Sequence, residues 1–222
     1  MLNDLLKEHH IKPSQVIKFD LDKALKLDLS KDNQVLSTID VNDEDEFTQF
    51  IFDQLASADA EVGWGGYGEN RGLYARSDLF SDEEARTLHL GIDIWAKAGT
   101  PVYAPLEGKV HSFNNLAVHG DYGPVIILEH AIGGATLYSL YGHLAQRSLE
   151  GLRVGQWIKQ GELFAWLGEY GENYHWPPHL HFQLMWDLQG HSGDYPGVAK
   201  LSQRQEFLDN CPDPEAWVFS VD

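Results

Sequence analysis

The most informative stretch of this sequence is residues 179–184, which read His179-Leu180-His181-Phe182-Gln183-Leu184. In an extended strand, successive side chains point to opposite faces. The odd positions of this stretch therefore form a polar face, and the even positions form an apolar face that is typical of packing against a core. The polar face presents two imidazoles about 7 Å apart. We predict a strand here that carries a functional site.

Two further stretches hold residues of the same types. They read His89-Leu90-Gly91-Ile92-Asp93 and Tyr141-Gly142-His143-Leu144. His89 and Asp93 would also meet on a helix, but Gly91 and the β-branched Ile92 favour an extended or irregular segment.

Imidazole and carboxylate groups together suit a divalent metal such as zinc. A catalytic zinc site typically has three protein ligands and one open position. The five candidates are two more than the metal needs, and a hydrolase also requires groups that move protons or stabilise an oxyanion. The candidates are His89, Asp93, His143, His179 and His181.

Short apolar or alternating runs separated by glycines and turn residues predict most of the remaining fold. The run from Val125 to Leu128 is apolar at every position, so we expect it to be covered on both faces. Short strands at close spacing, without a strong helical period, favour an antiparallel β-sheet or sandwich-like core. We predict strands at residues 102–104, 109–113, 125–129, 135–141, 163–167 and 179–186.

Residues 1–60 differ from residues 61–222, and we predict that they form a small N-terminal α+β extension. Leu2, Leu5 and Leu6 have helical spacing, and Pro13 ends that helix. Apolar residues then alternate with charged ones over 17–29, which predicts one or two strands. Asp43 and Glu46 form a capping-box pattern before a short amphipathic helix over 47–55. The chain is thus expected to be mainly β, and α+β overall.

From His89 to Trp186 the chain resembles the lysostaphin/LytM-type zinc metalloendopeptidases, a family that includes peptidoglycan hydrolases. The five polar positions occur in the family's order, and the glycine turns agree as well, at residues 98–105, 108–110 and 155–162. The resemblance implies that His89, Asp93 and His181 bind one zinc ion per chain. It also implies that His143 and His179 are the catalytic histidines, without saying which of them is the base.

The loop at residues 170–178 departs from the family, whose members commonly have a Gly-rich loop with Ser or Thr at this place. Here the loop is bulky and aromatic, and it predicts a cleft wall that changes substrate preference. The Gly-rich segment at residues 63–68 lacks the Lys-Ser/Thr of a phosphate-binding loop, and is either a cleft-edge lid or a plain connection. The candidate substrate-binding residues are Arg71, Tyr74, Tyr174, His175 and Trp176.

The leading hypothesis is a metallopeptidase that hydrolyses a peptide or related amide bond with a zinc-activated water. One alternative is a non-haem Fe(II) oxygenase, because two histidines and a carboxylate also form its facial triad. That triad does not require His143 and His179. A second alternative is a catalytically silent LytM-like binding module, although such modules usually lose ligands.

The composition limits the partners and the compartment. The chain has 222 residues and a formal net charge of −18, which argues against nucleic acid and anionic membranes as partners. Cys211 is the only cysteine, so no intrachain disulfide can form, which fits a reducing compartment. The first residues lack the apolar run of a secretory signal, so we expect a cytoplasmic protein. The sequence does not predict the oligomeric state.

Overall fold

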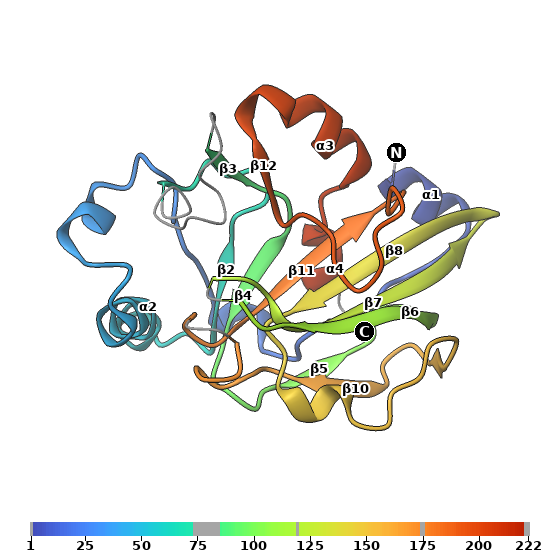
Figure 1. Cartoon of the computed structure of the whole chain (residues 1–222), viewed down its shortest axis with the longest axis horizontal. Coiled ribbons are helices and arrows are strands. Elements are labelled where there is room, and N and C mark those ends of the chain that lie inside the picture. The colour runs from blue at the N-terminus through green and yellow to red at the C-terminus, as the bar shows by residue number, and fades with distance from the viewer. Residues whose placement is uncertain (1, 73–84, 119, 174–175, 220–222) are drawn as a thin grey trace.

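A computed structural model describes residues 2–72, 85–118, 120–173 and 176–219. In these residues strands outnumber helices, and the main feature is a twisted sheet of eight strands (Figure 1). In order across the sheet, the strands are β1 (Ala24–Lys26), β2 (Val62–Gly65), β4 (Ile92–Trp95), β11 (His179–Met185), β8 (Ala135–Gly142), β7 (Gly123–Ile132), β6 (Gly108–Leu116) and β9 (Trp157–Ile158).

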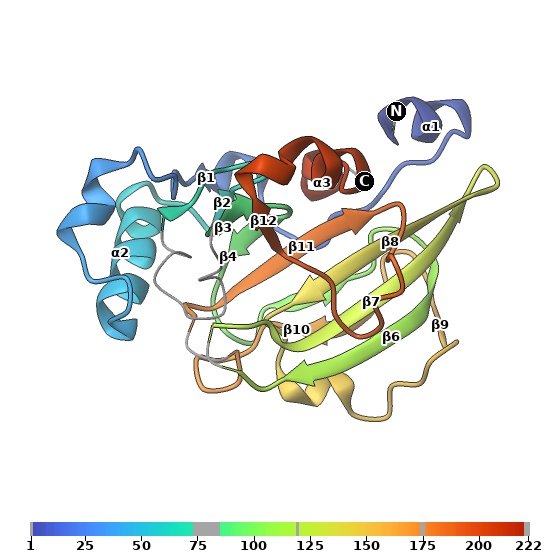
Figure 2. The same ribbon diagram turned by 45° about the horizontal axis from the view of Figure 1, so that its top comes forward.

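The pairing of the strands confirms the predicted antiparallel core. Every pair in the large sheet is antiparallel except β1 with β2. Two smaller antiparallel sheets lie beside it (Figure 2). They consist of β5 (Pro101–Tyr103) with β10 (Leu163–Trp166), and of β3 (Arg86–His89) with β12 (Val198–Lys200). All six strands predicted from the runs in the sequence are present, with bounds shifted by a few residues.

Apolar side chains cover both faces of the sheet. On β11, Leu180, Phe182 and Leu184 belong to the larger buried cluster, as the alternation predicted. The apolar run in β7 divides between two clusters: Ile126 and Leu128 join the larger one, whereas Val125 and Ile127 join a second one. Both faces of β7 are therefore covered, and the polar face of β11 is left for the site.

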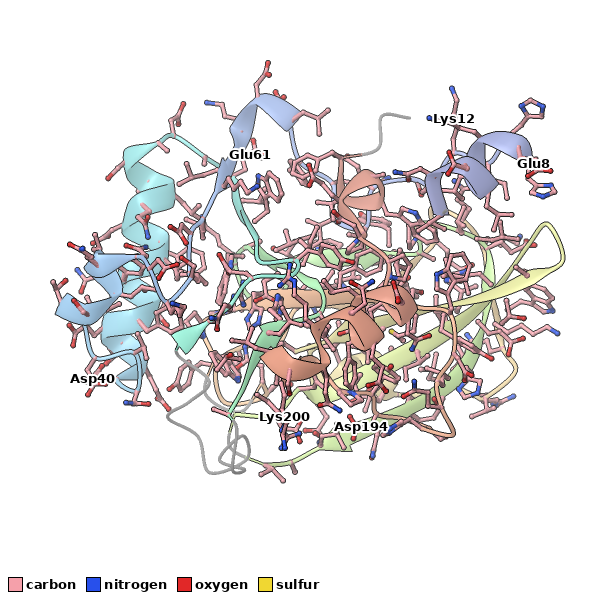
Figure 3. All side chains as sticks on the ribbon, turned by 90° about the horizontal axis from the view of Figure 1, so that it is seen from above. Glu8, Lys12, Asp40, Glu61, Asp194 and Lys200 are labelled. Atoms are coloured by element: carbon pink, nitrogen blue, oxygen red, sulfur yellow. The ribbon has the colours of Figure 1, made fainter. Side chains whose placement is uncertain are left out.

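The N-terminal region contains the two predicted helices. They are α1 (Leu2–Glu8) and α2 (Glu44–Ser57). The side chain of Asp43 accepts a hydrogen bond from the Glu46 backbone N–H, which caps the start of α2 as the sequence predicted. Figure 1 shows α2 beside β2, while α1 lies near the hairpin between β7 and β8. Figure 3 shows Glu8, the last residue of α1, at one end of the molecule and Asp40, in the chain before α2, at the other.

Of the one or two strands predicted over 17–29, one is present. Only β1 is a strand, and it is preceded by a 3-10 helix, η1 (Leu21–Lys23). The Asp20 side chain accepts a hydrogen bond from the Asp22 backbone N–H, and this local bond favours a turn over an extended chain. Since β1 pairs with β2, the N-terminal region contributes a strand to the main sheet. The domain division at residue 60 stays a prediction.

The remaining helices are short. They are η2 (Gln34–Thr38), η5 (Gln146–Leu149), η6 (Leu201–Gln203), α3 (Arg204–Asn210) and α4 (Glu215–Val218). Among the described residues, none of the helices has the length and apolar character needed to span a membrane.

Candidate metal centre

Strand register brings three of the predicted residues together. In the antiparallel pair of β4 and β11, Asp93 lies opposite His181. His89 ends β3, and the two residues Leu90 and Gly91 turn the chain into β4. This break between two strands confirms the extended or irregular segment expected there, and it directs His89 and Asp93 toward the same point.

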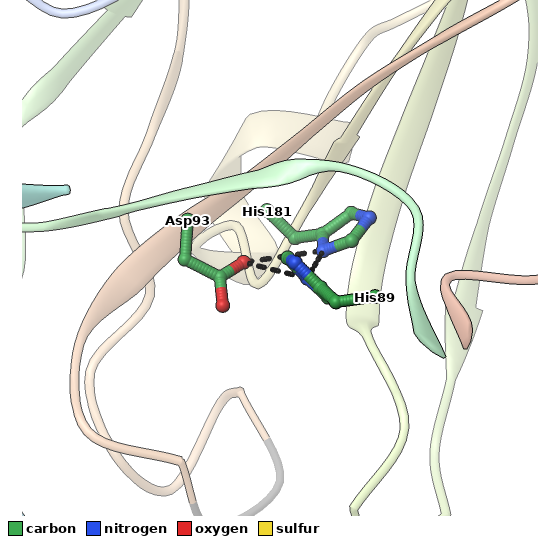
Figure 4. A group of neighbouring side chains, drawn as sticks. All are labelled: His89, Asp93 and His181. Carbon is green, nitrogen blue, oxygen red and sulfur yellow. Dashed lines mark hydrogen bonds and ion pairs between the residues drawn. The ribbon is translucent and has the colours of Figure 1, made fainter. Parts of the chain in front are cut away.

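The three ligand atoms form a nearly equilateral triangle (Figure 4). His89 Nε2 lies 3.0 Å from His181 Nδ1 and 3.3 Å from Asp93 Oδ1. The third side, from His181 Nδ1 to Asp93 Oδ1, measures 3.2 Å. Ligands of a tetrahedral zinc ion at bond lengths of 2.0–2.1 Å lie about 3.3–3.4 Å apart. The triangle therefore fits three ligands of a zinc ion with the fourth position open.

Each of these side chains is oriented by a contact at its other polar atom. His89 Nδ1 lies 3.0 Å from the Gly66 carbonyl oxygen, and His181 Nε2 lies 2.9 Å from Gln183 Oε1. The guanidinium of Arg71 donates to Asp93 Oδ2. Such outer contacts fix the tautomer of a histidine ligand and the orientation of a carboxylate. In the part of the chain that the structure describes, these three residues are the group that could hold a metal ion.

The two remaining histidines lie beside the triangle. His179 Nδ1 lies 2.7 Å from the Pro177 carbonyl oxygen, and His179 Nε2 lies 3.9 Å from Asp93 Oδ1. The ring stacks on Trp95, with centroids 4.2 Å apart. The centroids of His143 and His179 are 4.1 Å apart. His143 has φ of 59°, and its buried Nδ1 has no hydrogen-bond partner among the described residues.

Burial sets the protonation states of these groups. It lowers the pKa of His89 and of His179 to about 4, and it lowers that of His143 well below its usual range. Burial alone would raise the pKa of Asp93, but the charges of His89 and Arg71 hold it well below its ordinary value. Neutral imidazoles and an ionised carboxylate are the forms that bind a metal ion.

A cavity of about 270 Å³ opens onto the site. Trp176 lines it, and its ring centroid lies 6.2 Å from each of His143 and His179. Arg71 also lines the cavity, but its guanidinium is paired with Glu69 and Asp93, so its contact with a substrate stays a prediction. The other three candidates for substrate binding, Tyr74, Tyr174 and His175, lie outside the described residues.

Several residues of the cavity had no signal in the sequence. They lie at places that only the folded chain brings together, and no motif marks them. They include Arg86, Asp121, Tyr122, His191, Asp194 and Tyr195. Of these, Tyr122 lies against the site, with its ring centroid 5.1 Å from that of His181.

The structure thus holds, on an antiparallel sheet, a His-Asp-His triangle that could bind a metal ion, with two further histidines beside it. Residues 87–194 match the model of peptidase family M23. This match agrees with the resemblance to the lysostaphin-type zinc metallopeptidases that the motifs predicted for this part of the chain.

Individual proteins are similar to this part of the chain. An uncharacterised metalloprotease of Haemophilus influenzae is 36% identical over 96 residues, which are 43% of this chain and 18% of that protein. Lysostaphin of Staphylococcus simulans is 31% identical over 100 residues, 44% of this chain and 18% of lysostaphin. The chain thus spans about a fifth of the length of these relatives. The solved catalytic domain of lysostaphin superimposes with a TM-score of 0.40 at 26% identity, covering 60% of this chain and 80% of that domain.

Proposed function

We propose that this chain is a zinc metalloendopeptidase that hydrolyses a peptide or related amide bond. The observation that carries the proposal is the triangle of His89 Nε2, Asp93 Oδ1 and His181 Nδ1, with His143 and His179 beside it. We assign the first three residues as ligands of one zinc ion and the last two as catalytic residues. When bound there, zinc supplies a Lewis acid that activates water at neutral pH and polarises the scissile carbonyl.

His179 is suited to act as the general base. The Pro177 carbonyl can only accept a hydrogen bond, so His179 Nδ1 carries the proton and Nε2 keeps its lone pair. Nε2 faces the ligand triangle, 3.9 Å from Asp93 Oδ1. Because burial lowers its pKa to about 4, the ring is neutral at pH 7, as a base must be before it takes a proton. The stacked ring of Trp95 holds this orientation.

His143 is placed to stabilise the oxyanion of the tetrahedral intermediate. Its ring lies against that of His179 and lines the cavity. Its Nδ1 has no partner among the described residues, so it is available to donate a hydrogen bond as negative charge develops on the substrate oxygen. We therefore propose His179 as the base and His143 as the oxyanion donor.

These two histidines favour a hydrolase over the alternatives. A facial-triad oxygenase needs two histidines and one carboxylate only, and has no use for a second pair of imidazoles at the open side of the metal. A silent binding module would not need to keep all five residues in one buried arrangement.

The substrate we propose is a short peptide or small amide that carries an amine, in preference to intact peptidoglycan. Asp121 and Asp194 both line the cavity, and the chain has a net charge of −18. Arg71 and Arg86 line the same cavity, so the preference rests on the charge of the whole chain, which attracts cations and repels polyanionic polymers. An amine could also lie over the ring of Trp176, a contact that is typically worth about 0.5–2 kcal/mol. Nucleic acids and anionic membranes are disfavoured as partners for the same electrostatic reason.

We also propose a cytoplasmic location. Cys211 is buried and unpaired, as expected of a protein kept in a reducing compartment. Fractionation of the native cell tests this: recovery mainly from the periplasm, the medium or a wall fraction would contradict it.

The activity is tested by incubating the zinc-loaded chain with a library of short peptides and, separately, with purified sacculi. We expect turnover of short peptides with a free amine, weaker turnover of their acetylated forms, and no clearing of sacculi. Asp93→Ala should abolish both zinc binding and turnover. Cleavage of no amide by the zinc-loaded chain would refute the proposed activity, whereas sacculus clearing without peptide turnover would refute only the proposed substrate.

A further inference from the structure

The segment of residues 66–71 lies outside the residues that match the family model, which begin at 87. It follows β2 and runs antiparallel to the chain around His89. The Gly68 N–H donates to the His89 carbonyl at 2.9 Å, and the His89 N–H donates to the Glu69 carbonyl at 2.9 Å. The Arg71 N–H donates to the Thr87 carbonyl at 2.8 Å. The segment is therefore fixed to the strand that delivers one of the proposed ligands.

Two contacts from this segment, one from the backbone and one from a side chain, reach the side chains of the proposed ligands. The Gly66 carbonyl lies 3.0 Å from His89 Nδ1. A carbonyl only accepts, so this contact places the proton on Nδ1 and leaves Nε2 to bind the metal ion. The second contact is the ion pair of Arg71 Nη1 with Asp93 Oδ2, both of whose side chains are only 2% exposed. Since Oδ2 is occupied, Asp93 offers Oδ1 alone to the metal.

Arg71 is itself held by Glu69. Arg71 Nε donates to Glu69 Oε2 at 2.7 Å, and Glu69 Oε1 accepts from the Leu29 N–H at 3.3 Å. The guanidinium is a rigid plane that can donate to two carboxylates in fixed directions. The guanidinium of Arg71 thus lies between the carboxylates of Asp93 and Glu69. The backbone of Leu29, in the N-terminal region, holds Glu69 in place.

The packing leaves no room for a side chain at Gly66. A Cβ on Gly66 would lie 2.0 Å from Arg71 Nη2 and 2.8 Å from His89 Nδ1, and the residue has φ of +103°. Glycine is therefore required at the point where the backbone approaches both the ligand and the arginine.

We propose that Arg71, held by Glu69, is a positioning residue of the metal centre that makes Asp93 a one-oxygen ligand. The inference rests on the proposed zinc site, and it assigns to Arg71 a role at the metal in place of the substrate contact predicted from the sequence. It also means that residues 66–71 are part of the functional unit, although they precede the matched domain.

The test compares the full chain with Arg71→Lys, Arg71→Met and the double variant Glu69→Gln with Arg71→Met. The single change to Met leaves the partly buried Glu69 without its counter-charge, which could prevent folding. The double variant removes both of these charges, so it remains informative in that case. Arg147→Met is the matched control, because it removes one guanidinium that stacks on Trp166 at 4.5 Å, on an exposed helix away from the centre. The affinity for Zn²⁺ alone is measured by competition with a chelator, and the coordination number by the visible spectrum after substitution with Co²⁺.

We expect each Arg71 variant to bind zinc about 10–100-fold more weakly, the usual cost of losing an outer contact to a ligand, and Arg147→Met to bind as the wild type does. The Co²⁺ spectrum of the Arg71 variants should lose intensity, because release of Oδ2 lets Asp93 bind through both oxygens and raises the coordination number. Wild-type zinc affinity in Arg71→Lys and in the double variant would overturn the proposal. A higher KM with unchanged zinc affinity would likewise overturn it and return Arg71 to substrate binding. No readout of the metal requires a substrate, so a failure of the proposed peptidase activity leaves this test intact.

Discussion

Gly91 gives the sharpest test of the metal centre, because a single added methyl group would meet a proposed ligand. It lies between His89 and Asp93, where β3 turns into β4. A Cβ at this position would lie 2.7 Å from the Phe182 carbonyl oxygen and 2.8 Å from His181 Nε2. Its backbone conformation is open to any residue, so the effect of Gly91→Ala comes from contact alone.

The size of the effect follows from these distances. Ordinary contact begins at 3.4 Å, so the neighbours must move by about 0.6–0.7 Å. The Phe182 backbone is paired with Ile92 on one side and Tyr141 on the other, within the centre of the sheet. The imidazole of His181 moves more easily. Metal–ligand distances vary by only about 0.2 Å in well-formed sites, so we expect zinc to bind at least about 10–100-fold more weakly, as when a ligand loses its orientation.

The assay is chelator competition for Zn²⁺, with the thermal midpoint of the zinc-free protein as the measure of folding. Gly171→Ala is the matched control, because a Cβ there meets nothing within 4 Å and its φ is not positive. The control should bind zinc with wild-type affinity. A folded Gly91→Ala variant with wild-type zinc affinity would show that His181 is not a ligand, or that the site is looser than the structure indicates.

Three further changes test separate parts of the molecule. The His143→Ala variant should still bind one zinc ion per chain by metal analysis, but its kcat should fall about 10²–10⁴-fold, the usual range for a general acid–base group. Loss of the zinc would contradict the division into ligands and catalytic residues. Trp95→Leu removes the ring stacked on His179. Because an aromatic pair contributes about 0.5–1.5 kcal/mol, this change should lower kcat by up to about tenfold, while KM and zinc content are retained. A change in KM alone would refute the role of the stack. Burial lowers the pKa of His130 to about 4, from about 6.5 in the unfolded chain. Between these values the unfolded chain binds a proton that the folded chain does not, so stability is lost as the pH falls from 6.5 toward 4. The loss from pH 7 to pH 5 should be about 2 kcal/mol larger in the wild type than in His130→Gln, as measured by urea unfolding; equal losses would show that His130 does not titrate in this way.

The strands were predictable because their signals are local, and the five candidate residues that the structure brings together lie in short local motifs. Alternation in residues 179–184 identifies a strand with one polar face whatever its neighbours are. The run from Val125 to Leu128 likewise predicts a strand covered on both faces, and the two core clusters confirm it. The N-cap half of the predicted capping box is a contact within one turn, and it occurs: Asp43 accepts from the Glu46 N–H, whereas the Asp43 N–H donates to the Asp40 carbonyl.

Features that depend on distant parts of the chain were not predictable. The alternation over 17–29 predicted one or two strands but not where a strand begins or ends. The side-chain bond of Asp20 favours a turn, and only Ala24–Lys26 pairs with β2. The glycine-rich segment at 63–68 was expected to be a lid or a plain connection, yet Val62–Gly65 is strand β2. No motif indicates that Gly66 and Arg71 meet His89 and Asp93, since that contact exists only once β2 lies beside β4.

The core and the metal centre depend on the same register. On β11 the apolar side chains of Leu180, Phe182 and Leu184 are buried in the larger cluster, while His179 and His181 face the cavity. A slip of one residue between β4 and β11 would turn both imidazoles toward the core and expose the apolar side chains. The burial of three apolar residues therefore disfavours any register other than the one that places His181 opposite Asp93. Hydrophobic packing on one face of the strand thus sets the geometry of the zinc site on the other.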